Sequence, residues 1–190
     1  MTPILFDHFQ SPTDLWKHIK SKKEGENDLV VFAEQIFDLI TDLQSGKVEP
    51  SNDLRPIIIS LLEDFEERSS RYRFSIIQAA KLGLAAFIDE TVLNKDFILK
   101  EEWEKYPILL ELLGEWHRGS KFFERLDVML PHIDVTAEVV ELYYICMLLG
   151  FRGKYAIYQQ DEFPQIMQKT ADALVKAGKS SNLYFEEDEK

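Results

Sequence analysis

AAFIDETVLN, residues 85–94, and ELYYICMLLGFRGKY, residues 141–155, are the two stretches that decide the fold of this chain. Both are apolar over most of their length, and their apolar residues recur at the spacing of three and four that is typical of a helix. Small residues before and within the first stretch allow close helix approach: Ala79, Ala80, Gly83, Ala85 and Ala86. We therefore expect a long central helix over about 72–94 and a second helix from Asp134 to Leu149.

The rest of the chain also has helical periodicity, interrupted by capping residues, prolines and glycines. A β-branched run at 57–59 lies between helix signals, so no strand is expected and the predicted fold class is an all-α helical bundle. The further helices are expected near 3–9, over 12–22, from Asn27 to Gly46, from Ser51 or Asp53 to about 68, briefly before Pro107, over 107–116 with an end near Gly119, from Ser120 to Leu130, and from Pro164 to Gly178.

Composition excludes several classes of protein. The 190 residues include 34 acidic and 22 basic side chains, for a formal net charge of -12, so binding to nucleic acid is not expected. Cys146 is the single cysteine, which excludes an internal disulfide and a Cys-rich zinc site, and its apolar surroundings predict a buried, inert thiol.

No targeting or membrane-spanning segment is visible in the sequence. The start, MTPILFDHFQ, lacks the basic residues and long apolar run of a signal peptide. YYICMLLGF, the strongest apolar candidate, is broken by Gly150 and Arg152 and is much shorter than the roughly 20 residues that cross a bilayer. The sequence predicts a domain that faces the cytoplasm.

Catalytic motifs are missing. Di-iron bundles place a glutamate three residues before a histidine, and none of the four histidines has one. Gly178-Lys179-Ser180 resembles the end of a phosphate-binding loop, but Ala173 occupies the position of the first glycine and the segment follows a helix. We expect no enzyme activity, no cofactor and no metal site.

Asp89 and Glu90 are the acidic pair that interrupts the apolar central helix. On the residues alone, the favoured interpretation is that both carboxylates are solvated, or that one of them caps the turn into Lys95. The alternative is a partner-binding site, in which Thr91 and Asn94 assist by hydrogen bonding and a partner arginine or lysine pairs with the carboxylates.

Gly150, Arg152 and Gly153 are expected to form a structural turn after the second apolar helix. Glycines permit a sharp reversal of the chain, and Arg152 can bond carbonyls at a helix end or a nearby carboxylate. For Arg152 this structural role is favoured over a binding role.

Three segments together carry a family resemblance: DET at 89–91, GEWHRGSKFFERL at 114–126 and GFRGKY at 150–155. With them the chain resembles the DotU/TssL (IcmH/DotU) family, membrane-complex components of type VI secretion systems and, in a divergent branch, of the type IVB system. The resemblance is strong over about 74–177 and weak before that. GEWHRGSKFF departs from the more glycine-rich, acidic stretch usual in the family, which leaves the shape of that loop open.

The resemblance implies a cytoplasmic domain over 1–180, built as two three-helix bundles in a hook-like arrangement. It also implies that a polar tail, 181–190, leads to a single membrane-spanning helix soon after Glu189. The acidic pair would then lie at a cleft between the bundles, at least partly exposed, and contribute more to partner binding than to folding. The implied location is the cytoplasmic face of the bacterial inner membrane.

The implied function is a non-enzymatic component that links the membrane complex to the baseplate. The implied partners are an IcmF/TssM-type inner-membrane protein and TssK- or TssE-type baseplate proteins, with a possible weak homodimer. Two alternatives stay open from the residues: a soluble helical adaptor or regulator outside secretion, and a metal-dependent helical enzyme.

Overall fold

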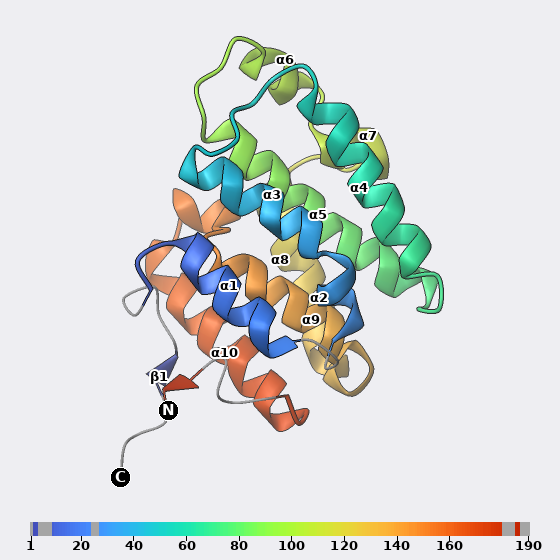
Figure 1. Ribbon diagram of the computed structural model, residues 1–190. Helices are drawn as coiled ribbons and strands as arrows, with labels where there is room; N and C mark the ends of the chain where they lie inside the picture. Colours follow the sequence, from blue (N-terminus) through green and yellow to red (C-terminus); the bar gives the residue numbers. More distant parts are fainter. Residues whose placement is uncertain (1, 4–8, 24–26, 180–184, 187–190) are drawn as a thin grey trace.

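Helices form nearly all of the regular structure in the computed structural model, which describes residues 2–3, 9–23, 27–179 and 185–186 (Figure 1). The all-α class is therefore confirmed. The helices are α1 (Pro12–Lys23), α2 (Asp28–Phe32), α3 (Glu34–Ser45), α4 (Leu54–Arg68), α5 (Phe74–Leu93), α6 (Lys100–Lys105), α7 (Ile108–Leu113), α8 (Arg118–Met129), α9 (Ile133–Leu148) and α10 (Phe163–Lys176), with the 3-10 turns η2 (Leu130–His132), η3 (Gly153–Ala156) and η4 (Gln160–Glu162).

Helix α5 is the longest helix in the described part of the chain and lies at its centre, in contact with α3, α4, α7, α8 and α9. It is apolar on almost every side, and a helix of that kind is stable only when neighbours cover it all round. Helix α9 is equally apolar and packs on α5. The contact is close because a Cβ atom at Gly83 would lie 2.6 Å from Cε1 of Tyr143.

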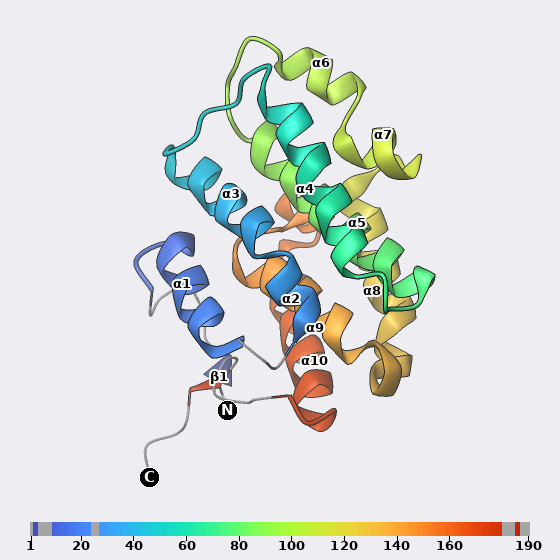
Figure 2. The same cartoon turned by 45° about the vertical axis from the view of Figure 1, so that its right-hand side comes forward.

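The outer helices cover these two. Helix α4 lies outside α5, α10 packs on α9, and α1 packs on α3 (Figure 2). The indole nitrogen of Trp16 in α1 donates a hydrogen bond of 2.7 Å to Asp38 in α3. The division into two three-helix bundles stays a prediction.

Two-residue strands β1 (Thr2–Pro3) and β2 (Phe185–Glu186) pair antiparallel, so the expectation that no β-sheet forms is wrong at this one place. Sequence pattern could not reveal the pairing because the partners come from opposite ends of the chain. The helix expected near 3–9 falls mostly outside the described residues, and Pro3 itself is extended.

Some helix boundaries also differ from expectation. The helix over 108–113 ends at Gly114, which has a φ of 65°, and not near Gly119. Helix α8 begins at Arg118, before the expected cap Ser120. The helix expected from Asn27 to Gly46 is interrupted at Ala33, although Asn27 does cap it and Gly46 does end it in the left-handed conformation.

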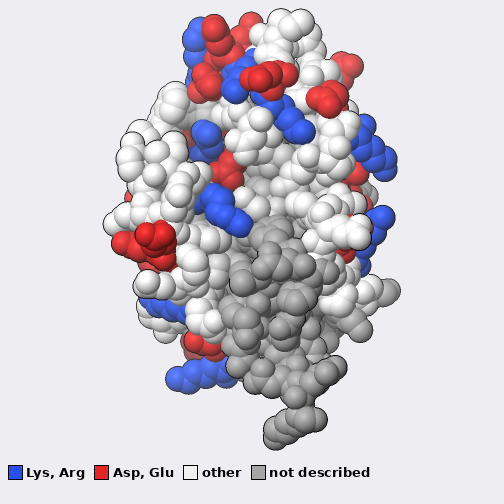
Figure 3. All heavy atoms as spheres, turned by 90° about the vertical axis from the view of Figure 1, so that its left-hand side faces the viewer, with Lys and Arg blue, Asp and Glu red and all other residues white. Residues whose placement is uncertain are grey.

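None of the helices in the described ranges is long and apolar enough to cross a membrane. On the face at the left of Figure 1, acidic and basic side chains are intermixed and much of the visible surface is uncharged (Figure 3). On the part of this face that the structure describes, the acidic side chains therefore do not form one continuous acidic field.

Candidate functional site

A polar groove lies at the carboxyl end of α5, where this helix meets the end of α3 and the turn after α9. Its volume is about 260 Å³. The groove is lined by Gln44, Phe87, Glu90, Thr91, Asn94, Lys95 and Gly150.

The walls of the groove are tied together by hydrogen bonds between segments far apart in sequence. The side-chain amide of Gln44, at the end of α3, donates a hydrogen bond of 2.8 Å to the carbonyl of Leu149 at the end of α9. The Lys95 ammonium lies 3.4 Å from the carbonyl of Gln44. Three helix ends are thereby held around one opening, so its shape is set by the fold.

Glu90 is partly buried and bonded to the turn that follows α9. Its carboxylate accepts hydrogen bonds from the backbone N–H groups of Arg152, at 3.0 Å, and of Gly153, at 2.8 Å. Burial raises the pKa of Glu90, while these two donors and the positive charges of Arg118 and Arg152 oppose the rise. Each carboxylate oxygen accepts more than one hydrogen bond, so Glu90 can still receive a donor from a partner.

Asp89 is fully buried, and the expectation that it would be partly exposed is wrong. Its carboxylate accepts hydrogen bonds from the Trp103 indole N–H at 2.9 Å and from the backbone N–H groups of Ile108 at 2.8 Å and Leu109 at 2.9 Å. Burial raises the pKa of Asp89, and the three donors oppose that rise.

These donors explain why a carboxylate lies inside the protein. Ile108 and Leu109 begin α7, where backbone N–H groups have no partner within their own helix. Asp89 therefore caps a helix about 20 residues later in sequence and also holds α6 through Trp103. Capping of a distant helix was not among the alternatives that the sequence suggested, which placed a cap at the turn into Lys95.

Thr91 and Asn94 differ in accessibility. Thr91 is buried, and its hydroxyl donates a hydrogen bond of 2.8 Å to the carbonyl of Phe87, one turn earlier in α5. Asn94 is exposed at the end of the helix. The structure thus brings three of the four predicted site residues to the groove, Glu90, Thr91 and Asn94, and places Asp89 behind it.

The turn after α9 adopts the reversal that its glycines allow. Gly150 has a φ of 118° and Gly153 a φ of 53°. The N–H of Phe151 donates a hydrogen bond of 3.0 Å to the carbonyl of Cys146, and the N–H of Gly150 donates one of 3.2 Å to the carbonyl of Met147. These two bonds satisfy carbonyl groups at the end of α9. A Cβ atom at Gly153 would lie 2.7 Å from the carbonyl oxygen of Gly119, so α8 approaches this turn closely.

The Arg152 side chain holds this turn in place. Its guanidinium donates hydrogen bonds of 2.9 Å to the carbonyl of Met147 and of 3.0 Å to the carbonyl of Phe151. The same group lies over the ring of Phe163, 4.3 Å from the ring centroid. Burial lowers the pKa of Arg152, and the charge of Glu90 opposes that change. Its contacts are those of a residue that orients backbone N–H groups toward Glu90.

Sequence reasoning missed Gln44 and Lys95 as residues of the groove. Gln44 lies in a helix whose periodicity shows only which side is buried, and nothing local indicates that its end meets α5. Lys95 was considered only as part of the turn after the central helix. Among the described residues, no group of three or more His, Cys, Asp or Glu side chains is arranged to hold a metal ion.

Comparison with known proteins gives one family and several solved structures. The family model described as "Type VI secretion system protein DotU" matches residues 28–189. No match is found among curated protein sequences.

Three of the similar structures are of TssL proteins. The cytoplasmic domain of TssL from Acinetobacter baumannii is 26% identical, with a TM-score of 0.72 over 80% of this chain and 98% of that one. TssL from Vibrio cholerae is 22% identical, with a TM-score of 0.71 over 80% and 97%. SciP/TssL from enteroaggregative Escherichia coli is 20% identical, with a TM-score of 0.65 over 84% and 94%. The latter two likenesses show the fold alone.

Proposed function

The chain belongs to the DotU family of type VI secretion system proteins, and we propose that it is a non-enzymatic component of the inner-membrane complex that links this complex to the baseplate. The proposal rests on the family membership and on the likeness to a TssL cytoplasmic domain. In this role the domain lies at the cytoplasmic face of the inner membrane and acts by protein–protein contacts.

The groove at the end of α5 is the observation that supports a partner-binding role. Glu90, Asn94 and Lys95 offer a carboxylate, an amide and an ammonium group within one opening. The backbone donors of the turn already fix the orientation of Glu90. A partner arginine or lysine that reaches Glu90 therefore meets a preorganised acceptor, and pairing of charges at a partly desolvated interface is stronger than on an open surface.

The proposed partners are TssK- or TssE-type baseplate proteins and the cytoplasmic part of an IcmF/TssM-type protein. Asp89 has a supporting role in this proposal, since it positions α6 and α7 and does not itself face the groove. Weak self-association of the domain is part of the same proposal.

The test is a substitution that fills the groove without disturbing the bonds of Glu90. Asn94→Arg places a long cation at an exposed position of the groove and leaves the turn after α9 intact. Asn52→Arg, at an exposed position before α4, is the matched control. Each variant is titrated by calorimetry against TssK-, TssE- and TssM-type proteins from the organism that encodes this chain.

We expect Asn94→Arg to weaken at least one of these interactions by tenfold or more, with an unchanged melting curve. The added guanidinium repels a partner arginine or lysine that approaches Glu90, and like-charge juxtaposition at an interface costs several kcal/mol, which is more than a tenfold loss of affinity. Equal affinity of the two variants for every partner would show that the groove is not the binding site.

A further inference from the structure

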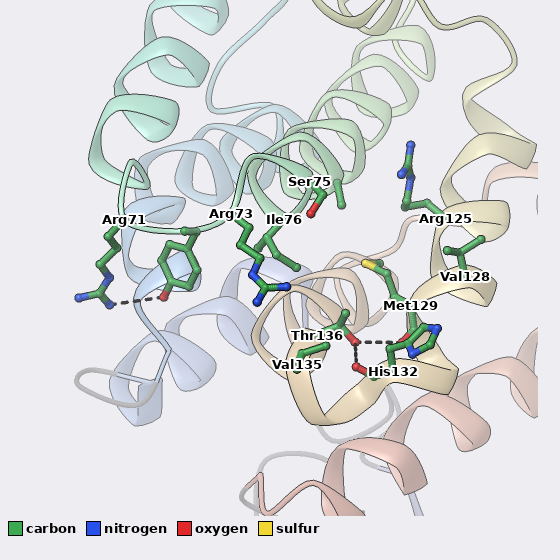
Figure 4. A pocket seen from close by; sticks show the side chains of 12 residues that line it. Arg71, Arg73, Ser75, Ile76, Arg125, Val128, Met129, His132, Val135 and Thr136 are labelled. Carbon is green, nitrogen blue, oxygen red and sulfur yellow. Dashed lines mark hydrogen bonds between the residues drawn. The ribbon is translucent and has the colours of Figure 1, made fainter.

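A second pocket lies at the other end of α5, between the start of α5, the carboxyl end of α8 and the start of α9 (Figure 4). Its volume is about 560 Å³, more than twice that of the groove beside Glu90. We call it the arginine pocket. The residues that line it are Arg71, Tyr72, Arg73, Ser75, Ile76, Ala79, Arg125, Val128, Met129, His132, Val135 and Thr136.

The charged side chains of the arginine pocket are all basic, although the chain as a whole has a net charge of -12. Arg71 has partners: it pairs with Asp28 and donates to the Tyr72 hydroxyl. Arg73 and Arg125 form no ion pair with any residue in the described ranges. Two guanidinium groups are therefore available at one opening.

None of the residues that line the arginine pocket carries a carboxylate. Glu138, two residues after Thr136 on α9, accepts a hydrogen bond from the Tyr72 hydroxyl. Burial together with this bond raises the pKa of Tyr72 to about 12. Asp127 and Asp134 lie on α8 and α9 but are not lining residues. In the view of Figure 4, Arg73 extends from the start of α5 toward the first turn of α9.

The remaining walls of the arginine pocket are mostly apolar. Ala79 and Met129 are buried at its base, and Ile76 is partly buried beside them. Val128 and Val135 stand at its edge with 64% and 66% of their surface exposed. Apolar side chains that gather around a concave site and carry a charged rim are typical of a surface that another protein covers.

We propose that the arginine pocket binds an acidic segment of another protein, in which one apolar side chain enters the pocket between carboxylates that pair with Arg73 and Arg125. Guanidinium groups form two parallel hydrogen bonds with a carboxylate, which gives both strength and orientation. The volume of about 560 Å³ lies within the range of about 300 to 1,000 Å³ in which proteins bind small molecules, so it is large enough for one apolar side chain.

An anionic membrane surface is the less suitable occupant. A bilayer is flat on this scale and does not enter a concave site, and a chain of this net charge is repelled by an anionic leaflet. The arginine pocket is also separate from the proposed baseplate site, because Ile76 and Glu90 lie roughly 20 Å apart along α5 at ~1.5 Å per residue. Both sites can therefore be occupied at once.

Selection from a random peptide library tests the proposal without knowledge of the natural partner. A phage-displayed library of twelve-residue peptides is selected on the whole chain and, in parallel, on the variant Arg73→Glu/Arg125→Glu. The control variant Lys105→Glu/Lys169→Glu makes the same change in net charge at exposed positions away from the pocket. Enriched peptides are synthesised and titrated by fluorescence anisotropy at low and high salt.

The expected result is enrichment, on the wild-type and control chains, of peptides with several acidic residues around one leucine, isoleucine or phenylalanine. Their binding should weaken at least tenfold with Arg73→Glu/Arg125→Glu and with added salt. Val135→Glu, at an exposed position on the edge of the pocket, should weaken peptide binding as well. If Arg73→Glu/Arg125→Glu has a lowered melting temperature, the peptide affinity of Val135→Glu is the result that tests the proposal.

Two results would overturn the proposal. One is that no acidic peptide is enriched, or that enriched peptides bind all variants equally. The other is sedimentation of the wild-type chain with vesicles of phosphatidylethanolamine and phosphatidylglycerol that is lost with Val135→Glu and with Arg73→Glu/Arg125→Glu, which would assign the pocket to a lipid surface.

Discussion

Asp89→Ala should destabilise this protein severely, because it removes the acceptor of three hydrogen bonds inside the fold. The donors are the Trp103 indole and the backbone N–H groups of Ile108 and Leu109, all in residues that are at most 4% exposed. A buried donor left without an acceptor costs about 1 to 3 kcal/mol. The start of α7 can relax and admit water, so the three costs do not add in full, and we expect a loss of about 3 to 5 kcal/mol.

This loss is a large share of the roughly 5 to 15 kcal/mol that stabilises a typical domain. For a chain of this size it corresponds to a fall in melting temperature of roughly 6 to 20 °C. The assay is thermal and urea unfolding followed by far-ultraviolet circular dichroism. Asp89→Asn keeps one acceptor oxygen but turns an amide donor toward other donors, and it should cost less than Asp89→Ala.

Two controls separate the bonds of Asp89 from the general effect of removing a carboxylate. Asp96 has a fully exposed side chain and only a long pair with Lys100, so Asp96→Ala should change stability by less than about 0.5 kcal/mol. Trp103→Phe removes one of the three donors and should cost less than Asp89→Ala. A melting temperature of Asp89→Ala within about 2 °C of the wild type would refute the reasoning.

Further predictions concern pH, packing and the thiol. Burial raises the pKa of Asp89 and Glu90, so above about pH 4 the folded state holds more protons than the unfolded state. The free energy of unfolding should therefore increase as the pH is lowered from 7 toward 5. Urea unfolding at each pH measures this increase, which should be smaller in Asp89→Asn. Gly83→Ala should cost about 1 to 3 kcal/mol because the new methyl group meets the buried Tyr143 ring, and a raised melting temperature would contradict this packing. Cys146 is fully buried, and burial raises the pKa of its thiol. Its reaction with a thiol reagent should therefore proceed only as fast as the protein unfolds. Rapid labelling of the folded chain would contradict this burial.

Local sequence determined which segments are helical and where most of them begin and end. The period of three to four in apolar residues acts through neighbouring turns, and Asn27 and Gly46 act on the helix ends next to them. The central position of α5 was predictable for a similar reason, because a helix that is apolar on all sides has to be covered. The family resemblance, carried by short motifs, was likewise available from sequence, and the family model confirms it.

Tertiary structure alone decided the roles of the acidic pair. Adjacent residues on a helix point in directions about 100° apart, so Asp89 faces α6 and α7 while Glu90 faces the turn after α9. Their partners lie about 20 and 60 residues away, and which helix ends meet there depends on how the whole bundle packs. The groove and the arginine pocket arise in the same way, from helix ends that only the packed fold brings together.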